Sequence, residues 1–246
     1  MTTQTLYGLH AVRGLLERDP ARVKKLRVAA GRADPKVVQL LELAQRSGCV
    51  VQRVDPKIFE RELAGAVHQG VVAEIEPMKA WTDEDLIAAI AAAQDPLVLV
   101  LDGVQDPHNL GACLRTADAC GAMAVVVPRD RAAQVNATVR KVAAGAAETT
   151  PVVQVTNLAR SLKLLQAAGL WIVGADAAGD KMAREVDLKG PIALVMGAEG
   201  TGMRQLTRQG CDHLVRLPQL GAVESLNVSV ATGMLLYEAL RQRGHA

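Results

Sequence analysis

The sequence contains 246 residues, of which 50% are hydrophobic, 2% are aromatic and 22% are charged, with a formal net charge of +2. This length suits one large domain, or a medium domain with a small one, and a packed core. The net charge is too weak to indicate a nucleic-acid partner by itself. The N-terminus lacks the regions of a signal peptide, and no apolar run approaches the ~20 residues of a membrane span, so we expect a cytoplasmic protein.

The four cysteines form no CxxC pair, and no histidine pair has metal-ligand spacing, so we expect no metal site. Basic residues are concentrated near the N-terminus, where residues 1–75 contain 12 Lys and Arg against 8 Asp and Glu. This excess indicates either a surface that contacts phosphates or a solvated face of a helix and a strand. Its densest part comprises Arg22, Lys24, Lys25, Arg27, Arg32, Lys36, Arg46 and Arg53, opposed only by Asp34 and Glu42.

The first 75 residues alternate between strand and helix patterns. Apolar runs predict strands at 26–29, 50–54 and 70–75, and helices lie between them, one from Pro35 to about residue 44 and one over 56–63. Such alternation favours a small α/β domain with a mainly parallel sheet. An alanine-rich helix over 81–93 follows, with Thr82 as its N-cap. We therefore expect a domain at 1–75 and a linker at 76–94.

From Pro96 onward the alternation is more regular. Residues 97–101 form a continuous apolar run, which is typical of a strand covered on both faces. About six strands joined by helices predict a doubly wound sheet in a second domain at 95–246. The expected strands are 97–101, 123–127, 151–155, 170–175, 192–196 and 213–217, and the expected helices are 110–120, 134–144, 157–168, 203–209 and 226–242.

The helix predicted at 110–120 has a polar side that could carry chemistry. Leu110, Leu114 and their neighbours share one face, whereas Gly111 and Arg115 lie almost opposite. Arg115 therefore points away from the core, and Gly111 leaves room for something large to approach the start of the helix. Asn109 is a suitable N-cap for this helix. An isolated arginine of this kind is also compatible with a simply solvated side chain.

Two polar segments follow strands of the second domain. Gly197-Ala198-Glu199-Gly200-Thr201-Gly202 comes after a buried strand, where ligands bind in open α/β sheets. Its spacing is GxxGxG, which matches neither the GxGxxG of dinucleotide sites nor a Walker loop, so a nicotinamide-dependent dehydrogenase is disfavoured. Further on, Ser225 is a candidate N-cap, and Asn227 and Ser229 add more hydrogen-bonding groups than one cap needs.

These segments together resemble the three motifs of the SpoU/TrmH family of RNA ribose 2′-O-methyltransferases. The N-terminal Tyr7-Gly8-Leu9-His10-Ala11-Val12 and His68-Gln69-Gly70-Val71 also resemble the small RNA-binding domain of this family. Glu224 departs from the pattern, which has a small polar residue there. The residues that match the motifs are Asn109 and Arg115 in the first, Gly197, Glu199 and Gly200 in the second, and Pro218, Ser225, Leu226, Asn227 and Ser229 in the third.

The resemblance implies an α/β methyltransferase domain with a deep trefoil knot, a homodimer, and S-adenosylmethionine as methyl donor. Within the family it points to methylation of a guanosine ribose in the peptidyl-transferase region of 23S rRNA. A tRNA ribose methyltransferase and a knotted RNA-binding protein without activity remain alternatives. The implied catalytic residues are Arg115, Asn109, Glu199, Ser225 and Asn227, and the implied cofactor-binding residues are Gly197, Leu217, Leu226, Gly200 and Pro218.

The chemistry of a guanidinium limits what Arg115 can do. Its pKa above about 12 makes arginine a poor free base. We therefore expect Arg115 to bind the adjacent phosphate and to stabilise the developing 2′-oxyanion, near the boundary between two subunits. Glu199 and Asn109 are then expected to orient Arg115, while Ser225 and Asn227 position the ribose.

Overall fold

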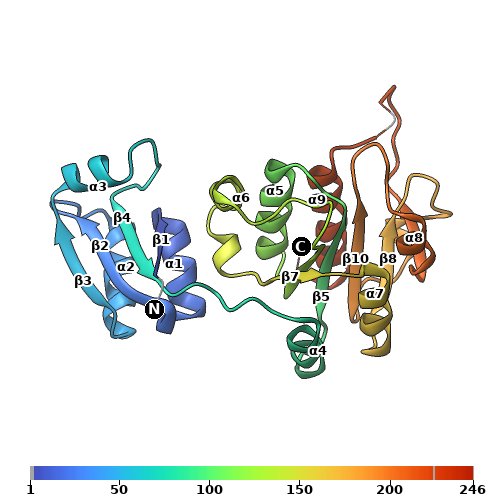
Figure 1. The fold of residues 1–246 in the computed structure, drawn as a ribbon, viewed down its shortest axis with the longest axis horizontal. Helices are drawn as coiled ribbons and strands as arrows, with labels where there is room; N and C mark the ends of the chain where they lie inside the picture. Colours follow the sequence, from blue (N-terminus) through green and yellow to red (C-terminus); the bar gives the residue numbers. More distant parts are fainter. Residues whose placement is uncertain (1–2, 224, 246) are drawn as a thin grey trace. The chain divides into compact units, whose positions relative to one another are not determined.

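The computed structural model describes residues 3–223 and 225–245 (Figure 1). The chain forms two compact units. The N-terminal unit runs to Lys79 and also includes Ala144–Thr149, and the C-terminal unit contains Ala80–Ala143 and the chain from Thr150 onward. Helix α4 (Asp83–Ala92) falls within the expected linker, but its Leu86 and Ile90 are buried in the core of the C-terminal unit. The connecting segment is therefore shorter than 76–94.

The N-terminal unit contains a four-stranded sheet in the order β1-β4-β2-β3. Strand β2 is parallel to β3, but β4 is antiparallel to both β1 and β2. The expectation of a mainly parallel sheet is therefore wrong, because β1 was not recognised and β4 inserts between β1 and β2. The elements are β1 (Gln4–Tyr7), α1 (Leu9–Arg18), the 3₁₀ turn η1 (Pro20–Arg22), β2 (Val23–Ala29), α2 (Pro35–Arg46), β3 (Val50–Val54), α3 (Pro56–Glu62) and β4 (Val71–Ile75).

Two apolar clusters hold this unit together. The larger cluster includes Leu9 and Val12 of α1 and Leu40 of α2, packed with side chains of the sheet. The smaller one surrounds Phe59 of α3, which is fully buried. Pro35 occupies the first helical position of α2, as the sequence predicts, and Asp34 caps this helix by accepting from the backbone N–H of Val37.

The segment Ala144–Thr149 completes the N-terminal unit from the middle of the chain. The carboxylate of Glu148 in η2 (Ala146–Glu148) lies 3.3 Å from Nη2 of Arg22 and accepts a hydrogen bond from Gln4 at 3.0 Å. Burial lowers the pKa of the Arg22 guanidinium from its usual value, although nearby carboxylates oppose this shift. Gly145 has a φ of 103° and lies against Ala11, where an added Cβ would come within 2.6 Å.

The C-terminal unit is built on a seven-stranded sheet in the order β7-β6-β5-β10-β8-β11-β9, and all its strand pairs are parallel. This confirms the predicted parallel α/β domain; the knot stays a prediction. Its elements after α4 are β5 (Leu97–Asp102), α5 (Pro107–Ala119), β6 (Ala124–Pro128), α6 (Ala137–Ala143), β7 (Val152–Val155), α7 (Leu158–Ala167), β8 (Trp171–Ala175), β9 (Lys181–Met182), η3 (Ala183–Glu185), β10 (Ile192–Gly197), α8 (Gln205–Gln209), β11 (His213–Arg216) and α9 (Val228–Gln242).

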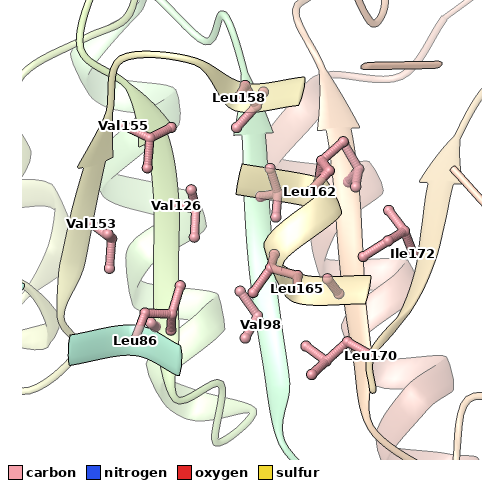
Figure 2. Close-up of a cluster of buried hydrophobic side chains, with 14 of the residues drawn as sticks. Leu86, Val98, Val126, Val153, Val155, Leu158, Leu162, Leu165, Leu170 and Ile172 are labelled. Atoms are coloured by element: carbon pink, nitrogen blue, oxygen red, sulfur yellow. The ribbon is translucent and has the colours of Figure 1, made fainter. Parts of the chain in front are cut away.

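Helices cover both faces of this sheet, which explains its continuous apolar strands. On one face, Leu158, Leu162 and Leu165 of α7 pack on alternate residues of the strands, together with Leu86 of α4 (Figure 2). On the other face, α5 packs against α6 and α9, and α9 contacts β10. The parallel arrangement brings the carboxyl ends of β5, β8, β10 and β11 to one edge of the sheet.

The close packing of α5 explains one of its glycines. A Cβ on Gly111 would lie 2.7 Å from Cβ of Val142 and 2.9 Å from the carbonyl oxygen of Val139, both in α6. The space beside Gly111 is therefore filled by a helix of the same chain. The helix also begins earlier than expected, because Asp106 is its N-cap and accepts from the backbone N–H of His108. Asn109 lies inside the first turn and is not the N-cap.

Candidate functional site

The glycine-rich loop after β10 folds back on itself. Ala198 and Gly202 form a bridge, with backbone hydrogen bonds of 3.1 and 2.9 Å. A Cβ on Gly197 would lie 2.3 Å from the carbonyl carbon of Gly202, so this position excludes every larger residue. Gly200 and Gly202 have φ values of 74° and 67°, which favour glycine. The loop's own folding thus requires these glycines, and the turn places Glu199 at its tip.

Helix α9 begins beside this loop. Its N-cap is Asn227, whose Oδ1 accepts from the backbone N–H of Ser229 at 2.9 Å and of Val230 at 3.4 Å. The Ser229 hydroxyl also donates to this oxygen, at 2.6 Å. Ser225 is therefore not the cap, since Asn227 supplies the capping oxygen two residues later.

Asn227 also joins the three predicted motifs in one cluster. Its Nδ2 donates to Oδ1 of Asn109 at 2.9 Å and to Oε1 of Glu199 at 2.5 Å. The same Glu199 oxygen accepts from the backbone N–H of Val228 at 3.2 Å. Three segments that are far apart in the sequence therefore meet at the carboxyl edge of the sheet.

A cavity of about 430 Å³ opens next to this cluster, between the ends of β8, β10 and β11 and the start of α9. Met196, Val215 and Val228 supply apolar wall, and Glu199, Asp176 and Arg208 supply charges of both signs. This volume lies in the range of small-molecule sites. S-adenosylmethionine carries apolar surface together with a sulfonium, an ammonium and a carboxylate, so its chemistry suits this lining. The predicted site residues that line it are Gly197, Gly200, Leu217, Leu226, Glu199 and Ser225, whereas Pro218 is exposed and does not line it.

Two charged residues of this cavity, Asp176 and Arg208, are not among the residues predicted from the sequence. Asp176 follows β8 directly and forms an ion pair with Arg208 of α8, with Nε and Oδ2 2.6 Å apart. Burial favours a higher pKa for the Asp176 carboxyl, but the hydrogen bonds from Arg208 and from the backbone N–H of Ala178, together with the charge of Arg208, lower this pKa overall. A carboxylate directly after a strand of a parallel sheet is the signal that would have identified Asp176.

Arg115 is separate from the cluster within one chain. It is exposed on α5, and its side chain forms no hydrogen bond or ion pair with any other described residue. It follows Asn109 by six residues, which corresponds to about 9 Å along the helix and a rotation of about 240°. Arg115 thus points away from the side on which Asn109 meets Asn227. Glu224, where the motif departs from the family pattern, lies outside the described residues.

The described part of the chain contains no group of three His, Cys, Asp or Glu residues that could hold a metal ion. The four cysteines are free thiols. Across the described ranges, no helix is both long and apolar enough to cross a membrane.

Intramolecular contacts occupy many basic side chains of the N-terminal unit. Arg27 pairs with Glu62 at 2.8 Å and lies 5.6 Å from the centre of the Phe59 ring. Arg53 donates to the carbonyl oxygen of Arg32 at 2.8 Å. These contacts favour the interpretation that part of the basic excess stabilises the unit itself. Further ion pairs involve Arg22 with Glu148, Lys24 with Glu76, Arg32 with Asp34 and Arg46 with Glu42.

Comparison with known families accounts for both units. Residues 96–237 match the model of the SpoU rRNA Methylase family, which covers more than half of the chain. The chain belongs to the SpoU rRNA methylase family. Residues 5–81 match a second model, described as RNA 2′-O ribose methyltransferase substrate binding. The family predicted from the three motifs is therefore confirmed.

Relatives of this SpoU family member match along nearly the whole chain. It is 56% identical over 241 residues to the 23S rRNA (guanosine-2′-O-)-methyltransferase RlmB of Pseudomonas aeruginosa, covering 98% of this chain and 97% of the relative. It is 49% identical to the protein of the same name from Escherichia coli K12, covering 98% and 99%. Among solved structures, the SpoU methyltransferase AviRb from Streptomyces viridochromogenes in complex with AdoMet matches with a TM-score of 0.74 and 27% identity, covering 99% of this chain and 92% of that chain.

Proposed function

We propose that this protein transfers a methyl group from S-adenosylmethionine to the ribose 2′-hydroxyl of one guanosine in 23S rRNA. The observation that carries the proposal is the hydrogen-bonded cluster of Asn109, Asn227 and Glu199 beside the 430 Å³ cavity. Relatives named for this reaction match over 98% of the chain, which supports the same substrate.

We assign the cavity to the methyl donor, held by Gly197, Gly200, Leu217 and Leu226. S-adenosylmethionine supplies an electrophilic methyl carbon, because its sulfur is positively charged. The chain must then orient the ribose and stabilise negative charge on its 2′-oxygen. Asn227 is held by the cap of α9 and by Glu199, so the cluster is rigid before substrate arrives. Ser225, at the cavity wall, is free to hydrogen-bond the ribose.

Arg115 is assigned to the site of a second copy in a homodimer. Its guanidinium has no partner among the described residues and points away from the cluster of its own chain. In a dimer built around α5 and α9, it would bind the phosphate next to the target ribose and stabilise the developing oxyanion. The dimer is supported by the exposed apolar stripe Val230, Met234 and Tyr237, which recurs at helical spacing on α9 beside α5.

We further propose that the N-terminal unit binds rRNA and that the protein acts in the cytoplasm, where its substrate is assembled. The match of residues 5–81 to a substrate-binding model supports the first assignment. Since binding would depend on Arg and Lys contacts to phosphate, affinity should fall steeply with salt concentration.

The reaction is tested by mapping 2′-O-methyl groups at nucleotide resolution in rRNA and tRNA from cells with and without the gene. We expect loss of a single methyl group on a guanosine of 23S rRNA, restored by the wild-type gene. Loss of a methyl group from tRNA instead, with rRNA unchanged, would refute the rRNA assignment.

Mixed dimers test the placement of Arg115. Arg115→Ala and Glu199→Gln copies are each expected to be inactive alone, whereas refolding or coexpressing the two together should restore about half of the wild-type activity per mixed dimer. In such a dimer, one site keeps Glu199 from one chain and Arg115 from the other. No restoration in verified mixed dimers would place Arg115 in its own chain's site.

A further inference from the structure

A second cavity, of about 470 Å³, lies on the other side of the glycine-rich loop from the cofactor cavity. It is bounded by the end of β5, the turn into α5, and Arg131 from the loop after β6. Glu199 and Val228 line both cavities, so the two spaces meet at the catalytic cluster. A group that enters the second cavity therefore lies next to the position assigned to the ribose.

Charged side chains of both signs face this second cavity. Asp106 uses Oδ1 to cap α5, and no described residue donates to its Oδ2. Arg131 is exposed at the wall and forms no hydrogen bond or ion pair through its side chain with another described residue. It also has a φ of 56°, which is uncommon for a residue with a long side chain. The cavity thus offers a free carboxylate oxygen and a free guanidinium.

Two largely buried polar residues, Asn109 and Asp102, also line the cavity. Asn109 is 8% exposed, and no described residue accepts from its amide N–H groups, although its oxygen is bonded to Asn227. Asp102 is 1% exposed; its Oδ2 accepts from the backbone N–H of Arg204, while Oδ1 faces Nε of Arg204 at 2.9 Å without hydrogen-bond geometry. The side-chain amide of Asn109 can therefore donate to a polar ligand in this cavity, whereas Asp102 is neutralised by Arg204.

We propose that this cavity binds the base of the target nucleotide and that Asp106 and Arg131 select guanine. The inference rests on the proposed function and names the part of the site that reads the base. Guanine presents two acceptors, O6 and N7, which suit an arginine. Its opposite edge carries the N1–H and N2–H donors, which suit a carboxylate. Asp106 and Arg131 supply this pair, and single-stranded RNA bases are commonly read on such edges after splaying out.

Other bases satisfy this arrangement less well. Adenine places an amino donor where guanine has O6, so it would leave Arg131 with an acceptor only at N7. Its N1 carries no hydrogen, so it would face the Asp106 carboxylate as a second acceptor. Hypoxanthine keeps O6, N7 and N1–H but lacks the 2-amino group. The three bases therefore test the two contacts separately.

Asp106→Asn isolates the carboxylate, because asparagine caps a helix about as well as aspartate. Arg131→Asn removes the guanidinium while keeping a residue type that tolerates positive φ. Arg129→Ala is the matched control, since Arg129 is an exposed arginine of the same loop that does not line the cavity. Each protein is assayed on synthetic 23S rRNA fragments that carry guanosine, inosine or adenosine at the mapped position.

We expect the wild type and Arg129→Ala to prefer guanosine over inosine in kcat/KM by about 10-fold or more. Asp106→Asn should reduce this ratio toward 1, and Arg131→Asn should lower kcat/KM for guanosine and inosine about 10- to 100-fold, with a smaller loss for adenosine, which offers only N7. Donor affinity by calorimetry and thermal melting should stay unchanged in both, which a merely structural role would not predict.

Wild-type methylation of all three RNAs with equal kcat/KM would overturn this assignment while leaving the proposed function intact. Unchanged base ratios in both cavity variants would do the same. If the wild type methylates none of the fragments and also fails on 23S rRNA from cells lacking the gene, the proposed function itself is refuted.

Discussion

Replacing Asn227 by aspartate or alanine separates the two roles of this side chain. Its Oδ1 caps α9 through Ser229 and Val230, while its Nδ2 lies 2.5 Å from Oε1 of Glu199. Asn227→Ala removes both roles. Asn227→Asp keeps a capping oxygen but turns the donor that faces Glu199 into a second carboxylate oxygen.

The contacts of Asn227 allow the loss of stability in each variant to be approximated. Loss of an N-cap costs about 1 kcal/mol, so Asn227→Ala, which also loses the hydrogen bonds of Nδ2, should be destabilised by at least this amount. In Asn227→Asp, two charges about 4 Å apart repel by about 1 kcal/mol in water and about 4 kcal/mol at an effective dielectric constant of 20. Both side chains are exposed, which favours the lower value. The interaction of the new negative charge with the dipole of α9 stabilises the folded variant by about 0.3–1 kcal/mol.

The sign of the pH dependence follows from the introduced carboxyl. Repulsion from Glu199 raises its pKa in the folded protein above the unfolded value of about 3.9, and the helix dipole offsets part of this rise. The folded state then holds a proton that the unfolded state has released. Relative to wild type, the free energy of unfolding of Asn227→Asp should therefore be highest below about pH 4 and should decrease as pH rises through the raised pKa.

Urea unfolding at pH 4 and pH 8, followed by tryptophan fluorescence, measures these differences. Trp81 and Trp171 both lie in the C-terminal unit, so the signal reports the unit that contains α9. The reasoning is refuted if the deficit of Asn227→Asp is equal at the two pH values. It is also refuted if Asn227→Ala is as stable as wild type.

Two further predictions concern packing and a buried ion pair. Gly111→Ala should cost about 1–3 kcal/mol in urea unfolding, because its Cβ meets α6, whereas Gly190→Ala, with open space around it, should change stability by less than about 1 kcal/mol. Arg22→Met should destabilise the N-terminal unit by about 3–5 kcal/mol in hydrogen exchange, because it removes the ion pair between Arg22 and Glu148, whose side chains are 12% and 4% exposed. Arg13→Met, in an exposed pair, should cost less than about 1 kcal/mol, and equal losses in the two arginine variants would contradict this account.

Local patterns in the sequence predicted most of the C-terminal unit. The strand at 97–101 and the helix with Thr82 as its N-cap were identified because apolar runs and capping residues act within a few positions. The topology of the N-terminal sheet was missed, because the pairing of β4 with β1 depends on contacts more than 60 residues apart. No local pattern in β4 reveals its direction.

The residues of the candidate site were predicted better than their local roles. Asn109, Glu199 and Asn227 were selected by resemblance to motifs, and the structure brings them into one cluster. The capping residues were less predictable. Asn109 was expected to cap α5, but Asp106 does so. Ser225 was expected to cap α9, but Asn227 does so. Capping depends on where the first turn begins, and sequence patterns leave that uncertain by a few residues.

Because Ala144–Thr149 belongs to the N-terminal unit, this unit cannot be produced intact as a single N-terminal fragment. A fragment that ends near Lys79 would lack Ala146, Ala147 and Glu148, which are buried in the intact chain. Arg22 would then be exposed without its carboxylate, and the surface left by the missing turn would be partly apolar. Isolated preparations of the first 79 residues should therefore be soluble and fully folded only when a peptide spanning 144–149 is supplied with them.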